Sequence, residues 1–309
     1  MNQYNRKKAL KFALAIFVSM TILLSFQNCS DVEFKTVEQL TSIKDIPIIC
    51  DPLVASGAVT SCDELTNGLV GEIFYFLNKE PSLDRISPFV YDVQDNPIPF
   101  PGGITTVEMF FQTAFRVPAV LFLSRIETPT VKFTTGFFDS NNKLIQDENG
   151  QALFEAFAIR VNSYLKLTPS LGEGHYEFAL LSDDGSILEL DLDQSGQLQA
   201  VVNNDKTQAT TLGCSENLVE LKRDQLYPLR LKYFQGPRSH IALTLLMRKV
   251  DDPATHTEDS LCGHVDSAFF GQDPAQNPNY VPEYVNSKFG QLLSRGWFVP
   301  PTEMFVLPK

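Results

Sequence analysis

The sequence is poor in the residues that enzymes and metal proteins most often use for chemistry. Its 309 residues include four histidines, five cysteines and one tryptophan. No histidine stands at metal-binding spacing from another, and none of the motifs Cys-x-x-Cys, His-Glu-x-x-His, Gly-x-Ser-x-Gly and Gly-x-Gly-x-x-Gly occurs. The sequence therefore predicts that the protein is not an enzyme.

Basic residues are also scarce. The chain has 25 lysines and arginines against 37 acidic residues, for a net charge of −12. Residues 1–28 hold four of the basic residues and none of the acidic ones, so the remainder is more acidic still. Such a surface repels phosphate backbones, which excludes nucleic acid as a partner and favours cations or neutral ligands such as sugars.

The sequence has no uninterrupted apolar run long enough to cross a membrane, which needs about 20 residues. Its most apolar stretch, Ala9–Leu24, contains Lys11, Ser19 and Thr21, and it follows a short cationic start. A cationic start before a short apolar run is the layout of a bacterial export signal. We expect a signal peptide over residues 1–28.

A cysteine directly follows this signal. The run from Leu24 to Ser30 resembles a lipoprotein lipobox, although Asn28 stands where the pattern has a small residue. The resemblance implies that Cys29 carries a diacylglycerol and becomes the mature N-terminus. Ser30, where an aspartate would be a retention signal, implies delivery to the outer membrane, on its periplasmic or surface face. The alternative is an ordinary signal peptide cut elsewhere, with Cys29 in a disulfide.

The remaining cysteines are even in number once Cys29 is assigned to lipid. Cys50, Cys62, Cys214 and Cys262 allow three disulfide pairings in an oxidising compartment. We favour Cys50–Cys62, which closes a short loop, and Cys214–Cys262, which ties the C-terminal region to the body of the protein. Zinc binding is the alternative, but the spacing does not suit it.

Helical periodicity is nearly absent between residues 68 and 249. Short apolar or alternating runs separated by turn residues occupy this region, and they predict strands. These runs include residues 73–77, 107–111, 120–123, 131–134, 157–161, 176–180 and 186–193. The pattern predicts an all-β domain, an antiparallel β-sandwich or barrel, whose core is filled by many of the 24 phenylalanines.

The flanking regions have a different character. Residues 29–67 are polar and predict a tether. Residues 250–309 form a C-terminal extension that we expect to pack on the β-domain. Within it, Pro282 to Gly296 predicts one amphipathic helix, with Val285, Phe289, Leu292 and Leu293 on the packed face.

Three parts of the β-region together resemble one family, the PA14 domain. The matching segments are Gly68–Tyr75, Gly174–Phe178 with Ser182-Asp183-Asp184-Gly185-Ser186, and Tyr227–Gly236 followed by Ile241–Met247. The likeness covers residues 68–249. The family occurs in bacterial protective-antigen toxins, glycosidases, fungal flocculin adhesins and bacterial surface proteins, and its fold is an antiparallel β-barrel or sandwich.

The resemblance also implies a binding site. In the sugar-binding members, an Asp-Asp pair on the central hairpin holds Ca²⁺, which coordinates sugar hydroxyls; the matching residues here are Asp183 and Asp184. A second loop completes the site in those members, and Asn203, Asn204 and Asp205 are the candidates. Ca²⁺ takes six to eight oxygen ligands, which suits such a set. The alternative is that the aspartates only cap their own turn.

These observations predict an outer-membrane lipoprotein whose PA14 module binds a glycan in a calcium-dependent way. The alternative is a non-catalytic lipoprotein that docks a protein of the cell envelope through its C-terminal helix and Trp297–Val299. A hydrolase is a third and weaker interpretation. In hydrolases with this module catalysis resides in a separate large domain, and residues 250–309 are too few to form one.

Overall fold

The computed structural model describes residues 48–49, 66–75, 104–138, 144–146, 152–236, 239–277, 279 and 281–308. Most of the expected signal peptide and tether therefore lies outside the described residues, as do Cys29, Cys50 and Cys62. Within the described part of the chain, no helix is both long and apolar enough to cross a membrane.

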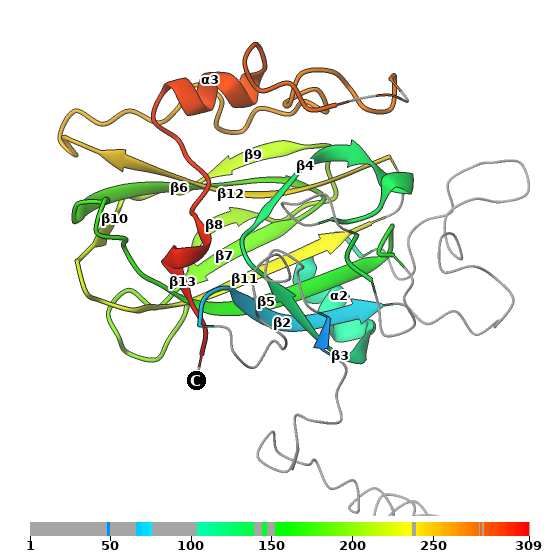
Figure 1. The fold of residues 1–309 in the computed structure, drawn as a ribbon, viewed down its shortest axis with the longest axis horizontal. Helices are drawn as coiled ribbons and strands as arrows, with labels where there is room; N and C mark the ends of the chain where they lie inside the picture. Colours follow the sequence, from blue (N-terminus) through cyan, green and yellow to red (C-terminus); the bar gives the residue numbers. More distant parts are fainter. Residues whose placement is uncertain are drawn as a thin grey trace, which may run out of the picture. The chain divides into compact units, whose positions relative to one another are not determined.

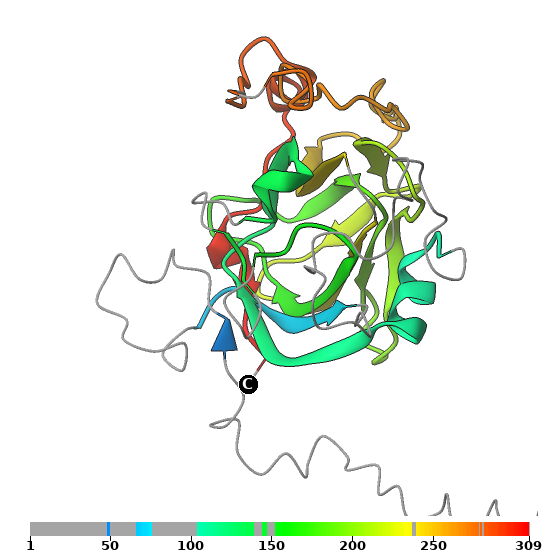
Figure 2. The ribbon, with the colours of Figure 1, turned by 90° about the vertical axis from the view of Figure 1, so that its right-hand side faces the viewer.

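Two β-sheets face each other in the described structure (Figures 1 and 2). The eight-stranded sheet has the order β1-β3-β2-β5-β11-β7-β8, with β13 also paired to β5. Its strands are β1 (Ile48–Ile49), β2 (Leu69–Tyr75), β3 (Phe115–Leu123), β5 (Phe157–Leu165), β7 (Ser186–Leu190), β8 (Gln199–Asn204), β11 (Tyr227–Gln235) and β13 (Phe305–Val306).

The five-stranded sheet has the order β10-β6-β12-β4, with β9 also paired to β6. Its strands are β4 (Glu127–Lys132), β6 (Gly174–Asp183), β9 (Thr211–Cys214), β10 (Val219–Leu221) and β12 (His240–Val250). Apart from the two-residue β1, which runs parallel to β3, the pairs of named strands in the described chain are antiparallel. The predicted all-β antiparallel sandwich is confirmed.

The core lies between the sheets and is rich in aromatic rings, as predicted. Phe137, Phe157 and Tyr233 are buried with ring centroids 5.6–5.9 Å apart. Along β6, Phe178 and Leu180 face this core, because side chains of a strand alternate between its two faces. Ala179 and Leu181, on the other face of β6, are buried as well, and the C-terminal extension covers them.

The extension packs on the outer face of the five-stranded sheet (Figure 1). Phe269, Phe270, Phe289, Leu292 and Trp297 form a second hydrophobic cluster against that face. The predicted disulfide between Cys214 of β9 and Cys262 of the extension is confirmed. Trp297 is only 2% exposed, so it is not available for the partner contact that the docking alternative assigned to it.

The helix predicted in the extension is shorter than expected. Helix α3 spans Lys288–Ser294, and two 3-10 turns, η6 (Phe133–Thr135) and η7 (Thr302–Met304), occur elsewhere. Ser287 caps α3, because its side chain accepts a hydrogen bond from the Gly290 N–H. Val285 lies before this cap and is 85% exposed, so placing it on the packed face was wrong.

Residues 107–111, predicted as a strand, are instead part of helix α2 (Val107–Thr113). The Thr106 side chain caps the helix by accepting from the Met109 N–H, and Asp205 Oδ1 accepts from the Val107 N–H at 2.8 Å. Val107 and Phe110, one turn apart, are buried in a cluster with residues of the eight-stranded sheet. The short apolar run did not distinguish a strand from one buried helix face.

Candidate calcium and sugar site at the Asp183–Asp184 turn

The Asp183–Asp184 pair sits where the chain passes from one sheet to the other. Asp183 is the last residue of β6, in the five-stranded sheet, and Ser186 begins β7, in the eight-stranded sheet. The peptide bond between the two aspartates is cis. Gly185 completes the turn, and a Cβ at this position would lie 2.4 Å from the Phe234 ring and 2.5 Å from Asp205 Oδ1. Only glycine fits there.

Asp184 joins its turn to two other loops. Its Oδ1 accepts a hydrogen bond from the Gln208 N–H at 2.9 Å, in the loop between β8 and β9. Its Oδ2 accepts one from the Gly236 N–H at 2.7 Å, directly after β11. A Cβ on Gly236 would lie 2.8 Å from the same oxygen, so the close approach depends on glycine. The carboxylate thus fixes three loops at one end of the sandwich.

Asp183 is held by both its side chain and its backbone. Its Oδ2 accepts a hydrogen bond from the Thr210 hydroxyl at 3.3 Å, and its carbonyl oxygen lies 2.7 Å from the Tyr233 hydroxyl, which donates to it. That hydroxyl is also 2.6 Å from Gln235 Oε1, and Gln235 Nε2 donates to the His240 carbonyl at 2.8 Å. The turn is therefore anchored to the ends of β11 and β12.

The two carboxylates are buried without a balancing positive charge. Asp183 and Asp184 are 4% and 5% exposed, and neither forms an ion pair within the described part of the chain. Burial, and next the charge of Asp184, raise the pKa of Asp183 well above its usual range, against hydrogen bonds from Thr210. Burial raises the pKa of Asp184 to about 7, although the Gln208 and Gly236 N–H groups lower it.

Of the three candidates expected on a second loop, Asn203 and Asn204 end strand β8 and only Asp205 lies in the loop that follows, and their roles differ. Asp205 is half-buried near Gly185, and it accepts from the N-terminus of α2. Asn204 is buried, and its Nδ2 donates to the Thr211 carbonyl at 2.9 Å and to Ser182 Oγ at 3.0 Å. Asn203 is exposed, and its Oδ1 accepts from the Asp205 N–H. The side-chain N–H groups of Asn204 thus hold β8 against the five-stranded sheet through these hydrogen bonds.

Sequence reasoning missed the three residues that donate hydrogen bonds to the two carboxylates, namely Gln208, Thr210 and Gly236. Gly236 lies at the end of the Tyr227–Gly236 segment that carries the family likeness, so its position was a usable signal. Gln208 and Thr210 donate from a loop that has no recognisable pattern, so the sequence gives no sign of them.

A second group of possible metal ligands occurs among the described residues, and it does not form a metal site as folded. A carboxylate oxygen of Glu177 lies within 4.8 Å of both sulfurs of Cys214 and Cys262. The two sulfurs are joined in the disulfide, so neither is a thiolate, the form that binds zinc. The zinc alternative does not hold for these two cysteines.

The family model of the PA14 domain matches residues 107–258. These residues form a PA14 domain. The match includes the Asp183–Asp184 turn and both of the loops that Asp184 joins to it. Sequence and structure therefore agree that the site lies within the PA14 domain.

Similar solved structures include the PA14 sugar-binding domain from an RTX adhesin (15% identity, 60% of this chain and 90% of that chain, TM-score 0.37). Another is the PA14 domain of the MpAFP antifreeze protein (13% identity, 67% and 93%, TM-score 0.41). An anti-sigma factor domain-containing protein is also similar (12% identity, TM-score 0.38), and 79% of this chain spans 48% of its length. No curated protein sequence matches the chain.

Proposed function

We propose that this protein is a non-catalytic lipoprotein of the outer membrane that binds glycans through its PA14 domain, with Ca²⁺ held at Asp183 and Asp184. The observation that carries the proposal is the pair of adjacent buried carboxylates, which has no cationic partner in the described part of the chain. Two neighbouring buried negative charges repel each other and need either a proton or a cation.

The donor chemistry of the turn fits calcium. The side chains offer carboxylate oxygens, the ligands that Ca²⁺ prefers. Each oxygen of Asp184 accepts one N–H group, and a carboxylate has about four lone-pair sites, so capacity for a metal remains. Bound Ca²⁺ would supply positive charge and open coordination positions for neighbouring sugar hydroxyls. Asp183 and Asp184 would hold it, and the loop of Asp205 lies beside them.

A neutral glycan is the ligand class that best suits the rest of the protein. The net charge of −12 disfavours polyanionic ligands, whereas a neutral sugar meets no such repulsion. The family likeness of the Ser182–Ser186 hairpin implies the same ligand class. Hydroxyl coordination by a metal gives affinity that removal of the metal abolishes.

A glycan array probed with the mature full chain tests this proposal. We expect binding in 2 mM Ca²⁺, loss of binding in EDTA, and loss in an Asp183→Asn variant. Asp251→Asn, a change of the same kind at an exposed aspartate, is the matched control and should bind normally. Binding that survives both EDTA and Asp183→Asn would refute the calcium role. If the protein binds no glycan on the array, the alternative of a lipoprotein that docks a protein of the cell envelope is favoured.

The lipid anchor is tested separately. A Cys29→Ser variant should lose incorporation of labelled palmitate and leave the membrane fraction, whereas the wild-type chain should sediment with outer membranes. If the variant still carries label or still sediments with membranes, the assignment of Cys29 is wrong. Since this result does not depend on sugar binding, the two parts of the proposal fail independently.

A further inference from the structure

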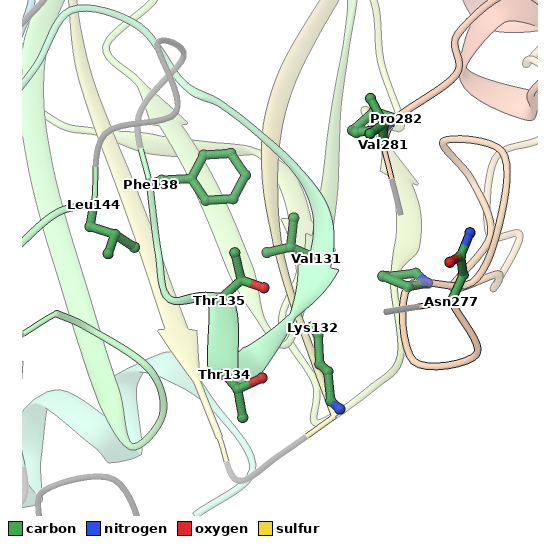
Figure 3. A pocket seen from close by; sticks show the side chains of 10 residues that line it. Val131, Lys132, Thr134, Thr135, Phe138, Leu144, Asn277, Val281 and Pro282 are labelled. Carbon is green, nitrogen blue, oxygen red and sulfur yellow. The ribbon is translucent and has the colours of Figure 1, made fainter. Parts of the chain in front are cut away.

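A cavity of about 680 Å³ lies between the β-domain and the extension, and it shares no lining residue with the Asp183–Asp184 turn (Figure 3). Its volume is in the range of small-molecule sites, about 300–1,000 Å³. Most of its lining is apolar. Val131, Phe138 and Leu144 of the β-domain line one side, and Pro274, Val281 and Pro282 of the extension line the other.

Three hydrogen-bond donors stand at one part of this apolar lining. Lys132 ends β4, and Thr134 and Thr135 follow it in η6. All three are exposed, and none of them forms an ion pair or a side-chain hydrogen bond to another described residue. The lining of the cavity thus includes one ammonium group and two hydroxyl groups, which can attract and hydrogen-bond a negatively charged group.

The wall contributed by the extension is held in place without a ligand. His240 Nε2, at the start of β12, lies 2.8 Å from Asp273 Oδ1, next to Pro274. The Glu283 N–H donates to the Phe270 carbonyl at 2.8 Å, next to Pro282, and Phe270 packs on Phe289 at 4.5 Å between ring centroids. These contacts fix the extension wall beside Pro274 and Pro282, which lowers the cost of ordering that wall when a ligand binds.

The rim of the cavity exposes apolar side chains to solvent. Val281 is 77% exposed and Leu144 is 37% exposed, so each leaves apolar surface uncovered. A ligand with an apolar body would remove this surface from water. A wholly apolar ligand would leave Lys132 and the two threonine hydroxyls unused.

We propose that this cavity binds a small amphipathic anion, a molecule with an apolar body and a carboxylate or sulfonate group. Its apolar body contacts Val131, Phe138, Leu144 and Val281. Its anionic group lies at Lys132 and accepts hydrogen bonds from the threonine hydroxyls. The site needs no metal, so binding persists in EDTA and stands independently of the calcium site.

Two fluorescent probes that differ only in the presence of a sulfonate group test the proposal. 8-Anilinonaphthalene-1-sulfonate carries a sulfonate, and N-phenyl-1-naphthylamine has the same rings without it. Titrated into the full chain in EDTA, both should bind, the sulfonate about tenfold more tightly, which corresponds to one charge-assisted contact. Excess decanoate should displace the sulfonate probe.

Variants separate the two halves of the site. Lys132→Met should abolish the preference for the sulfonate and leave the neutral probe unaffected. Leu144→Asp should weaken both probes at least tenfold, whereas Val285→Asp, at an exposed valine that does not line the cavity, should weaken neither. Circular dichroism melting verifies that each variant is folded. Equal affinity of the two probes, or unchanged binding in Leu144→Asp, would overturn the proposal.

Discussion

Strand β6 carries buried carboxylates in two surroundings that differ in charge. Glu177, near its start, lies under the extension, whereas Asp183 ends the strand at the candidate site. Arg248 binds Glu177 through Nε and Nη2, and Arg295 binds the neighbouring Asp259, to which Trp297 Nε1 also donates at 3.0 Å. In the region under the extension, arginine side chains bind the buried acids Glu177 and Asp259. At the candidate site, no basic side chain of the described structure forms an ion pair with Asp183 or Asp184.

The pKa values of Asp259 and Asp184 reflect this difference, whereas at Glu177 burial outweighs the hydrogen bond from Arg248 and raises the pKa. Burial raises the pKa of Asp259, but hydrogen bonds from Arg295, the Leu261 N–H and Trp297 outweigh it and lower the pKa to about 2. Burial raises the pKa of Asp184 to about 7, because only N–H groups oppose it. Asp259, which is paired with arginine, helps to hold the extension on the sheet. Asp183 and Asp184, which have no cationic partner in the described structure, form a buried negative site that a cation can occupy.

The strongest test of the comparison removes the carboxylate that the arginines surround. Asp259→Ala leaves the buried Trp297 N–H without its acceptor and removes the carboxylate partner of Arg295 and Arg248, so we expect a loss of about 3–5 kcal/mol in the free energy of unfolding. Urea unfolding followed by the fluorescence of Trp297, the only tryptophan, measures it. Asp251→Ala, at an exposed aspartate, is the control. A loss below about 1 kcal/mol for Asp259→Ala would mean that the network is not structural.

The disulfide ties the same region to β9 and provides the next largest effect. Cys214 and Cys262 are 48 residues apart in sequence, so their bond restricts a long loop of the unfolded chain. Replacing both by alanine should lower the free energy of unfolding by about 2–4 kcal/mol. A reducing agent should lower the stability of the wild-type protein more than that of the double variant, which lacks this bond. Equal stability of wild type and variant would contradict the assignment.

The contributions of Asp184 and Asp259 to stability should respond to pH in opposite directions. Between pH 4 and 7 folded Asp184 keeps a proton that the unfolded chain has released, so its contribution to stability falls as pH rises. We expect the stability of the wild-type protein, measured in EDTA, to fall relative to Asp184→Asn by about 2 kcal/mol from pH 5 to pH 7. For Asp259, whose pKa is lowered, stabilisation is present above pH 4 and is lost as pH falls toward 2.

Calcium should remove this first pH dependence if the metal binds at the turn, because the metal favours the deprotonated carboxylates. Unfolding curves at pH 5 and pH 7, each with and without 2 mM Ca²⁺, provide the comparison. A wild-type protein that loses no stability relative to Asp184→Asn between these pH values in EDTA would show that Asp184 is not an unmatched buried acid.

The sequence predicted the strands well where polar and apolar residues alternate clearly and where turn-forming residues separate the runs. The sandwich follows from these short-range signals, whereas the Cys214–Cys262 bond was favoured among three possible cysteine pairings because it ties the extension to the β-domain. The partners of the Asp183–Asp184 pair do not follow from such signals, since Gln208 and Gly236 reach Asp184 only through the meeting of three loops. Long-range contacts of this kind leave no periodic trace in a single sequence.

The errors in helix placement have a common physical cause. The pattern of residues 107–111 predicted a strand because a mostly apolar run of five residues is too short to distinguish the strand period of 2 residues from the helix period of 3.6 residues. The cap that decides the matter for α2 includes Asp205, which is 98 residues away from Val107. In the extension the deciding residue, Ser287, is local, but the apolar spacing of Val285 and Phe289 favoured a longer helix.

Two truncations to alanine separate the surface of the extension from its buried face, and the first of them should have the smallest effect of the series. Val285→Ala should change the free energy of unfolding by less than about 0.5 kcal/mol, since its side chain is 85% exposed and precedes the helix. Leu292→Ala, at a fully buried position of α3, should cost about 2–5 kcal/mol. Urea unfolding of both variants gives the contrast. A cost above 1 kcal/mol at Val285 would restore the longer helix and place this residue against the sheet. A negligible cost would confirm that the Val285 side chain takes no part in holding the extension on the sheet.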